Sequence, residues 1–297
     1  MTAVSPWPSS GLVDPPLLAV REAVGRALAE DILPLGDITA SLVPASSTAG
    51  AAVVARRPGV VAGRLCALEA FTQVDAELAV DWLLDDGSVV EAGSVVAVVN
   101  GRLRSILTAE RTALNFLCHL SGVATVARRY VEAVTAANPA TRVLDTRKTT
   151  PGLRALEKAA VRAGGAQNHR GNLSEAILVK DNHLGGLGIA DAVVRARQWW
   201  PGRMVEVECD RAEQVTEAVD AGAGAVLLDN MTPDEVAMCV RLVRSRAGGA
   251  DVLVEVSGGV TLDTAPLYAT AGADLISVGA ITHSAPVLDL GLDLQEG

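Results

Sequence analysis

The chain has 297 residues, a formal net charge of −10 and an apolar fraction of 49%. This length favours one large α/β domain or two domains with a substantial core. Only 3% of the residues are aromatic, so we expect an aliphatic core, as in α/β folds with buried parallel strands. The negative charge argues against a nucleic acid-binding or membrane-surface protein, because both need a broad basic surface.

We expect no targeting or membrane-anchoring segment. The first thirty residues lack a basic start followed by an apolar core, and no apolar stretch approaches the ~18 residues of a membrane span. The cysteines are far apart and form no Cys-x-x-Cys pair, which predicts neither a zinc site nor a disulfide framework. We expect reduced, mostly buried thiols in a cytoplasmic protein. These cysteines are Cys66, Cys118, Cys209 and Cys239.

The first hundred residues predict an α+β unit. A Pro-rich start is followed by an amphipathic segment near residues 17–28 and a turn-rich run over 30–39. Short β-like pieces and one helix-like piece come next, separated by turns that contain glycine. The β-like pieces lie near 51–55, 89–90 and 95–99, and the helix-like piece near 66–74. A longer helical pattern over about 105–137 leads into a second domain.

Beyond residue 140 the sequence alternates apolar strands with amphipathic helices. Strands are predicted near 142–146, 176–180, 204–208, 225–229, 252–256 and 274–278, and helices near 152–163, 188–199, 211–221, 233–245 and 261–271. Repeating βα units imply a parallel sheet, either closed as a barrel or open and doubly wound. Charged and glycine residues recur at the C-terminal ends of successive strands, which favours the barrel.

Lysine use marks one region of the chain. All three lysines lie between residues 148 and 180, and the other 22 basic residues are arginines. A compact ammonium group can reach a phosphate or carboxylate in a tight site, so we expect Lys148 and Lys180 in the site and Lys158 as a solvated surface charge. Arg147 and Arg170 would join them in a pocket for a polycarboxylate or a pyrophosphate. Scattered surface ion pairs are the alternative.

Two acidic residues close neighbouring predicted strands. Glu208 and Asp229 would lie near one another and suit a Mg²⁺ ion held largely through water and substrate oxygens. Simple ion pairing is the alternative interpretation. Glu206 points to the same side of its strand, one layer deeper, or it is a buried structural carboxylate paired with a lysine.

Glycines follow the last two predicted strands. Ser257-Gly258-Gly259, with a helix predicted to start at Thr261, and Gly279-Ala280 are typical of loops that hold a phosphate with backbone N–H groups. They imply a phosphorylated substrate. The four histidines show no metal-binding spacing, and His169, beside Arg170, is the one that we expect near the ligand.

Seven runs of the sequence together resemble the quinolinate phosphoribosyltransferase family. The resemblance extends over about residues 30 to 294, in order and at compatible spacing. The runs are Glu110 to Asn115, Asp145 to Arg154, Asn168 to Arg170, Leu178 to His183, Leu227 to Met231, Glu255 to Val260 and Val278 to Ser284.

The resemblance implies an α/β fold with two domains. These are an N-terminal α/β sandwich over residues 1–114, completed by residues 282–297, and an incomplete α/β barrel of about seven strands over residues 115–281. It also implies a homodimer, with a hexamer as the larger alternative, in which Arg111 enters the active site of the partner. The implied reaction joins quinolinate to phosphoribosyl pyrophosphate and yields nicotinate mononucleotide, CO2 and pyrophosphate, for NAD biosynthesis.

The same resemblance implies a role for each site residue. The quinolinate carboxylates would be held by Arg147, His169, Arg170, Lys180 and the partner's Arg111. Lys148 would lie between the two substrates, with Thr146 beside it, and Glu208 and Asp229 would contact ribose and Mg²⁺. Lys148, Glu208 and Asp229 are the expected catalytic residues. The 5′-phosphate would be held by Ser257, Gly258, Gly259, Gly279 and Ala280.

Some features depart from the family pattern or leave alternatives open. Cys209 follows Glu208 and would place a thiol near the metal unless it is buried, and residues 1–16 match nothing. The alternatives are a family relative associated with molybdenum transport, a Schiff-base aldolase that uses Lys180, and a phosphate-binding barrel without catalytic activity.

Overall fold

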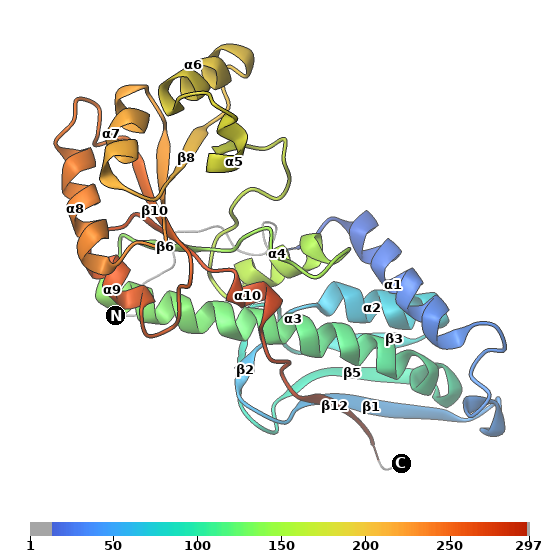
Figure 1. Ribbon diagram of the computed structural model, residues 1–297. Coiled ribbons are helices and arrows are strands. Elements are labelled where there is room, and N and C mark those ends of the chain that lie inside the picture. Colours follow the sequence, from blue (N-terminus) through green and yellow to red (C-terminus); the bar gives the residue numbers. More distant parts are fainter. Residues whose placement is uncertain (1–13, 296–297) are drawn as a thin grey trace. The chain divides into compact units, whose positions relative to one another are not determined.

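The computed structural model describes residues 14–295 and divides them into two compact units (Figure 1). Unit 1 contains residues 14–128, 149–165 and 281–295, and unit 2 contains residues 129–148 and 166–280. Helix α3 (Leu103–Ala137) runs unbroken through residue 114, where the sequence places a domain boundary. The predicted domain limits therefore stay a prediction, and the units are described separately.

Unit 1 is built on a four-stranded antiparallel sheet. Its strand order is β12-β1-β5-β3. The strands are β1 (Thr48–Ala55), β3 (Ala79–Trp82), β5 (Val95–Arg102) and β12 (Leu290–Leu294). The five residues of β12 pair with residues 51–55 of β1, so the late segment of the chain completes a sheet whose other strands come from the first hundred residues. β2 (Gly59–Val60) and β4 (Val89–Val90) form a separate short ladder.

Unit 1 also contains helices. They are α1 (Leu17–Ile32), the short 3₁₀ helix η1 (Ala40–Leu42), α2 (Arg64–Val74) and α4 (Arg154–Ala163). Figure 1 shows α2 and the first part of α3 along one face of the four-stranded sheet. Alternate residues of β1 and β5, such as Val53 and Val99, are fully or almost fully buried, as expected for strands of a half-covered sheet.

Lys158 does not carry the surface charge that the sequence predicted. Its exposed fraction is 6%, and seven of the ten residues of α4 are buried, including Glu157. The prediction was wrong because α4 is surrounded within unit 1. A helix on the outer surface of a barrel would have left this lysine in solvent.

Unit 2 contains six parallel strands in the order β6-β11-β10-β9-β8-β7. They are β6 (Arg142–Leu144), β7 (Ile177–Val179), β8 (Val205–Cys209), β9 (Ala225–Asp229), β10 (Leu253–Ser257) and β11 (Leu275–Ser277). Gln167 forms an isolated parallel bridge with Leu144 beyond β6. The α/β fold is confirmed, with six strands and one bridge where about seven strands were expected.

Helices connect the strands of unit 2. They are α5 (Asp181–Leu184), α6 (Ile189–Trp199), α7 (Ala212–Asp220), α8 (Pro233–Arg244) and α9 (Ala265–Thr270), and α10 (Ala280–His283) follows β11. Alternation of this kind is typical of a parallel sheet, in which all C-terminal strand ends lie at one edge. No helix among the described residues is long and apolar enough to span a membrane.

We predict that Leu290→Ala destabilises unit 1. Leu290 is 4% exposed at the start of β12, so its truncation should lower the free energy of unfolding by about 2–5 kcal/mol. Chemical denaturation followed by circular dichroism measures the loss. Leu294→Ala, on the same strand at 51% exposure, is the matched control and should change stability by about 0.5 kcal/mol or less. Equal losses for both variants would contradict this account of β12.

Candidate active site

A pocket of about 460 Å³ opens at the C-terminal edge of the parallel sheet in unit 2. Its lining mixes cations, acids and glycines from all six strands, from the loops that follow them and from the segment between α4 and β7. Large pockets at this edge are the usual ligand sites of parallel α/β folds. The predicted site residues that line it are Thr146, Arg147, Lys148, His169, Arg170, Lys180, Glu208, Asp229, Ser257, Gly258 and Gly259.

Three predicted site residues do not line this pocket. Gly279 and Ala280 follow β11 and lead into α10. Arg111 belongs to the part of α3 that lies in unit 1, where its side chain is exposed. Residues that line the pocket but were not predicted are Leu178, Leu227, Asn230, Glu255 and Ser277.

The cations of the pocket are held by defined partners. Lys180 Nζ forms an ion pair with Glu208 Oε2, and one guanidinium nitrogen of Arg170 donates to the carbonyl of Ala176 at 3.1 Å. Burial lowers the pKa of Arg170, the positive charge of Arg147 lowers that pKa further, and Glu206 opposes both effects. The pocket is therefore a crowded positive site, suited to a ligand with several negative charges.

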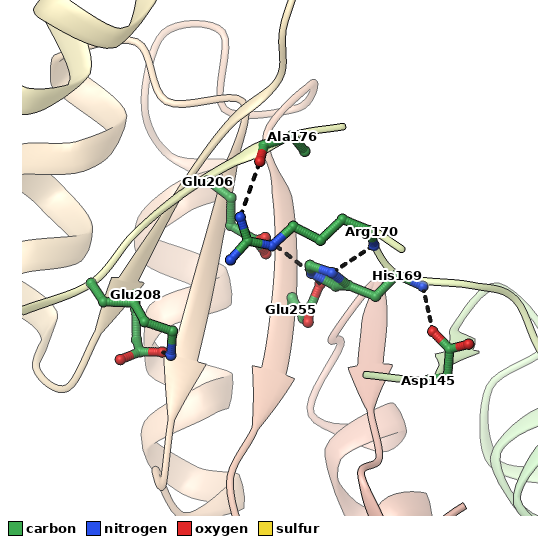
Figure 2. Close-up of polar contacts among 8 residues, drawn as sticks. Asp145, His169, Arg170, Ala176, Glu206, Glu208 and Glu255 are labelled. Atoms are coloured by element: carbon green, nitrogen blue, oxygen red, sulfur yellow. Dashed lines mark hydrogen bonds and ion pairs between the residues drawn. The ribbon is translucent and has the colours of Figure 1, made fainter. Parts of the chain in front are cut away.

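Both ring nitrogens of His169 are used within the protein. Nδ1 accepts a hydrogen bond from the backbone N–H of Arg170 at 2.8 Å, which assigns the ring proton to Nε2. Nε2 then donates to Glu206 Oε2 at 3.1 Å. Figure 2 shows the ring between the backbone of Arg170 and the two glutamates, Glu206 and Glu255. His169 therefore orients its neighbours, and because it also lines the pocket, the predicted contact with the ligand stays a prediction.

Asp145 fixes the segment that carries His169 and Arg170. It is fully buried at the end of β6. One of its oxygens accepts from the backbone N–H of His169 at 2.9 Å, and the other accepts from Asn168 Nδ2 at 2.7 Å. Together with the bridge between Leu144 and Gln167, these hydrogen bonds tie residues 167–169 to the edge strand β6.

Two buried glutamates lie beneath the cations. Glu206 on β8 and Glu255 on β10 are each 1% exposed. The sequence left open whether Glu206 pairs with a lysine, and the structure pairs it with His169 instead. Burial raises the pKa of Glu255 well above its ordinary value, the charge of Glu206 raises that pKa further, and Ser277 opposes the shift.

His169, Glu206 and Glu255 are close enough to hold a metal ion, with one ligand atom from each within 4.8 Å of the others. The hydrogen bonding of the ring argues against this. A metal at Nε2 would displace the ring proton while Nδ1 still accepts from Arg170, and the imidazole would then lack any proton. We therefore interpret the cluster as a hydrogen-bonded group.

Asn230 joins the ends of β9 and β10. Its φ is 56°, and it is the one residue other than glycine with a positive φ in residues 14–295, a conformation that asparagine tolerates best among side chains with a Cβ. Its backbone N–H donates to the carbonyl of Ser257 at 3.0 Å, and its Nδ2 donates to Asp229 Oδ2 at 2.7 Å. Asn230 thereby orients the carboxylate of Asp229 at the pocket.

The helix after the first glycine loop is preceded by a capped turn. α9 is Ala265–Thr270, but Thr261 and Thr264 already bond reciprocally, each hydroxyl accepting from the backbone N–H of the other. This is the pattern of a capping box, and the carbonyl of Thr261 accepts from the backbone N–H of Ala265 at 2.9 Å. The first helical turn therefore begins near Thr261, close behind Gly258 and Gly259.

The thiol of Cys209 points away from the pocket. Cys209 is fully buried, and burial raises its pKa to about 12. Successive strand residues face opposite sides, so Glu208 reaches the pocket while Cys209 packs behind the sheet. All four cysteines are free, and all but Cys118 are buried, which confirms the expectation of mostly buried thiols.

The missed residues left a weak signal in the sequence. Glu255, like Glu206, interrupts an apolar strand with an acid, and buried acids of this kind are rare unless paired. The sequence indicates Glu206 because Glu208 follows two residues later on the same strand, but Glu255 has no such acidic neighbour on its strand. Asp145 and Asn168 stand within family-like runs, yet nothing in the sequence indicates that they bond to each other.

Family comparison agrees with this geometry. The family model described as quinolinate phosphoribosyl transferase, N-terminal domain, matches residues 37–121, and the C-terminal domain of the same family matches residues 123–293. Together they cover most of the chain. The chain belongs to the quinolinate phosphoribosyl transferase family.

Individual relatives agree over nearly their whole length. The chain is 41% identical to a carboxylating nicotinate-nucleotide pyrophosphorylase of Mycobacterium leprae, over 93% of this chain and 97% of the relative. It is 40% identical to the human protein of that name, over 86% of this chain and 85% of the relative. The solved structure of the nicotinate-nucleotide pyrophosphorylase from Francisella tularensis matches with a TM-score of 0.89 and 38% identity, covering 97% of this chain and all of that one.

We predict that the two glycines of the first loop differ in their tolerance of alanine. A Cβ at Gly258 would lie 2.3 Å from Asn230 Oδ1 and 2.8 Å from its backbone nitrogen, whereas a Cβ at Gly259 meets nothing within 4 Å. Gly259→Ala should cost about 1–2 kcal/mol of unfolding free energy, from its left-handed φ alone. Gly258→Ala should cost clearly more in the same urea titration. A smaller loss at Gly258 would contradict this description of the loop.

We also predict that Cys209 resists alkylation in the native protein. Its pKa of about 12 leaves almost no thiolate at pH 8 to 9, and the thiolate is the reactive species. Mass spectrometry after iodoacetamide treatment should find Cys209 unmodified in buffer and modified in denaturant. Cys118, which is partly exposed, serves as the internal comparison. Rapid native labelling of Cys209 would show that its thiol reaches solvent.

Proposed function

We propose that this chain is a decarboxylating quinolinate phosphoribosyltransferase. In the proposed reaction, quinolinate and phosphoribosyl pyrophosphate give nicotinate mononucleotide, CO2 and pyrophosphate. The observation that carries the proposal is the pocket itself, where four cations, two strand-end acids and a glycine loop meet. The names of the relatives, from bacteria to human, support the same reaction.

The charges of the pocket match those of the two substrates. Quinolinate has two adjacent carboxylates, and Arg147, Arg170 and Lys180 offer the planar and point-like cations that bind such groups. Lys148 follows Arg147 directly and would lie between quinolinate and the pyrophosphate group of the second substrate. The backbone N–H groups of Gly258 and Gly259 are suited to the 5′-phosphate.

A Mg²⁺ ion is part of the proposal. Glu208 and Asp229 are carboxylates at the ends of the neighbouring strands β8 and β9, and both line the pocket. This donor set fits an ion that takes one or two carboxylates and completes its shell with water and phosphate oxygens. When bound, Mg²⁺ would neutralise charge on the pyrophosphate group.

The residues of the pocket position the reactants and stabilise charge. Lys148 and Arg147 would offset the negative charge that grows on the departing pyrophosphate as the ribose C1 gains oxocarbenium character. The pyridine nitrogen of quinolinate attacks C1, held in line by the cations around its carboxylates. The positive charge of the quaternised ring nitrogen then stabilises the electron pair left on C2 when CO2 departs, and that pair forms the new bond to a proton.

The proposal includes a homodimer with shared active sites, or a hexamer built from such dimers. Arg111 is exposed on α3 and does not line the pocket of unit 2, which is compatible with a role in the pocket of a second copy. A cytoplasmic location also belongs to the proposal, favoured by four free cysteines.

The alternative functions explain less of the pocket. A Schiff-base enzyme would need the amine of Lys180 as a nucleophile, but this side chain forms an ion pair with Glu208. A phosphate-binding barrel without catalysis would leave the acids at Glu208 and Asp229 without a purpose. The relative associated with molybdenum transport shares the fold, and the substrate assay below separates it.

We predict that the purified protein releases CO2 and pyrophosphate from quinolinate and phosphoribosyl pyrophosphate, and only with Mg²⁺ present. Nicotinate should react at least about a hundredfold more slowly, because without the C2 carboxylate a cationic part of the pocket stays unpaired. Carboxyl-labelled quinolinate measures CO2 release, and a coupled assay measures pyrophosphate. Comparable turnover of nicotinate would rule out the proposed substrate.

Hybrid dimers test the shared site. Arg111→Ala and Lys148→Ala should each reduce turnover strongly. Mixing the two proteins under conditions of subunit exchange should restore up to about a quarter of wild-type activity, because about half of the dimers are hybrids and each hybrid contains one intact site. The readout is the pyrophosphate assay, with each variant alone as the control. Exchange without any recovery of activity would show that the Arg111 and Lys148 of one site come from the same chain.

A further inference from the structure

Positive charges that share a pocket need an internal anion to hold their orientation. Arg147 and Arg170 line the same pocket, and the charge of each disfavours the other. Glu206 is the buried acid whose charge favours the guanidinium of Arg170. The position of Glu206 therefore affects how the positive charge of Arg170 is presented to a substrate. The role that we assign to Glu206 rests on the proposed function.

Glu206 and Glu255 meet at a single atom. His169 Nε2 lies 3.1 Å from Glu206 Oε2 and 3.5 Å from Glu255 Oε2. The two acids come from β8 and β10, the strands on either side of β9, and Figure 2 shows both beside the ring of His169. The Oε1 atoms of both are buried without a hydrogen-bond partner among the described residues.

The two acids are not equivalent. Glu206 Oε2 accepts a hydrogen bond from the Nε2–H of His169 at 3.1 Å, whereas Glu255 Oε2 lies 3.5 Å from the same nitrogen. The opposite side of the ring accepts the backbone N–H of Arg170. Rotation of the ring would therefore break a bond to Arg170 as well as the bond to Glu206.

We propose that Glu206 is a positioning residue, which holds His169 and, through it, Arg170 in the orientation that receives quinolinate. Glu206 does not line the pocket, so it acts on the substrate only through the ring of His169. Glu255 lines the pocket beside the same ring nitrogen but is farther from it.

Amide substitutions separate the two glutamates. Glu255→Gln keeps the shape of the side chain and leaves the hydrogen bond between His169 and Glu206 in place, so the KM for quinolinate should stay within about threefold of wild type. Glu206→Gln replaces the carboxylate that accepts from His169 by an amide, which is a weaker acceptor, and the KM for quinolinate should rise by about tenfold or more, as for the loss of a residue that orients a binding group. The KM for phosphoribosyl pyrophosphate and kcat should change much less.

Asp274→Asn is the matched control. Asp274 belongs to the same unit and accepts from the backbone N–H of Val254 at 2.7 Å and from Arg244 at 2.6 Å. It precedes β11, at the edge of the sheet opposite the pocket. Its substitution should lower the thermal midpoint without changing either KM, which separates damage to the unit from damage to the site.

The outcomes distinguish the inference from the function on which it rests. If the wild-type protein does not convert quinolinate, the proposed function fails. If it does, an equal rise in the KM for quinolinate in Glu206→Gln and Glu255→Gln would overturn the inference, and so would an unchanged KM in Glu206→Gln. Should Glu206→Gln not fold, Glu206→Asp keeps the charge but withdraws it from the ring. A raised KM for quinolinate alone would then support the inference, and an unchanged KM would overturn it.

Discussion

The central constraint on this protein is charge crowding at one edge of a parallel sheet. The chain has a net charge of −10, yet Arg147, Lys148, Arg170 and Lys180 share one pocket. The charge of Arg147 disfavours that of Arg170, and both side chains are partly removed from water. Acidic side chains at two depths offset this positive charge. Glu208 forms an ion pair with Lys180 at the pocket, and Glu206 and Glu255 are buried beneath it.

These two layers of acid have different chemical roles because they differ in burial. The side chain of Glu208 is 18% exposed, so it is open to the solvent of the pocket. Glu206 and Glu255 are 1% exposed, and of these two only Glu255 lines the pocket. A single strand thus supplies an accessible carboxylate and a buried one, two residues apart. The period of two along β8 places both on the inner side.

Much of this arrangement could be predicted from the sequence, because buried parallel strands appear as short apolar runs that end in polar residues. β9 reads Ala-Val-Leu-Leu-Asp, a buried strand with its acid at the end, and the structure places that acid in the pocket. The predicted strands of unit 2 agree with the observed ones to within two residues at each end. The helix start predicted at Thr261 is present as a capped turn, and α9 follows it from Ala265.

Other features could not be predicted, because they depend on contacts between distant segments. The burial of Lys158 follows from the unit that surrounds α4, which periodicity along a helix does not reveal. The use of both His169 nitrogens needs Arg170, Glu206 and Glu255 in place at once. Sequence patterns identify such polar residues as candidates for a functional site. They do not say whether a histidine faces a ligand or holds its neighbour.

The pairing of β12 with β1 has a consequence for the order of folding during synthesis. β1 is made early and pairs on one side with β5, but its other edge finds a partner only when residues 290–294 emerge. Until then β1 is an edge strand that presents free backbone groups to any other nascent chain. The whole of unit 2 is translated during that interval. A ribosome that stalls within unit 2 would therefore hold a protein whose first sheet is still open along β1.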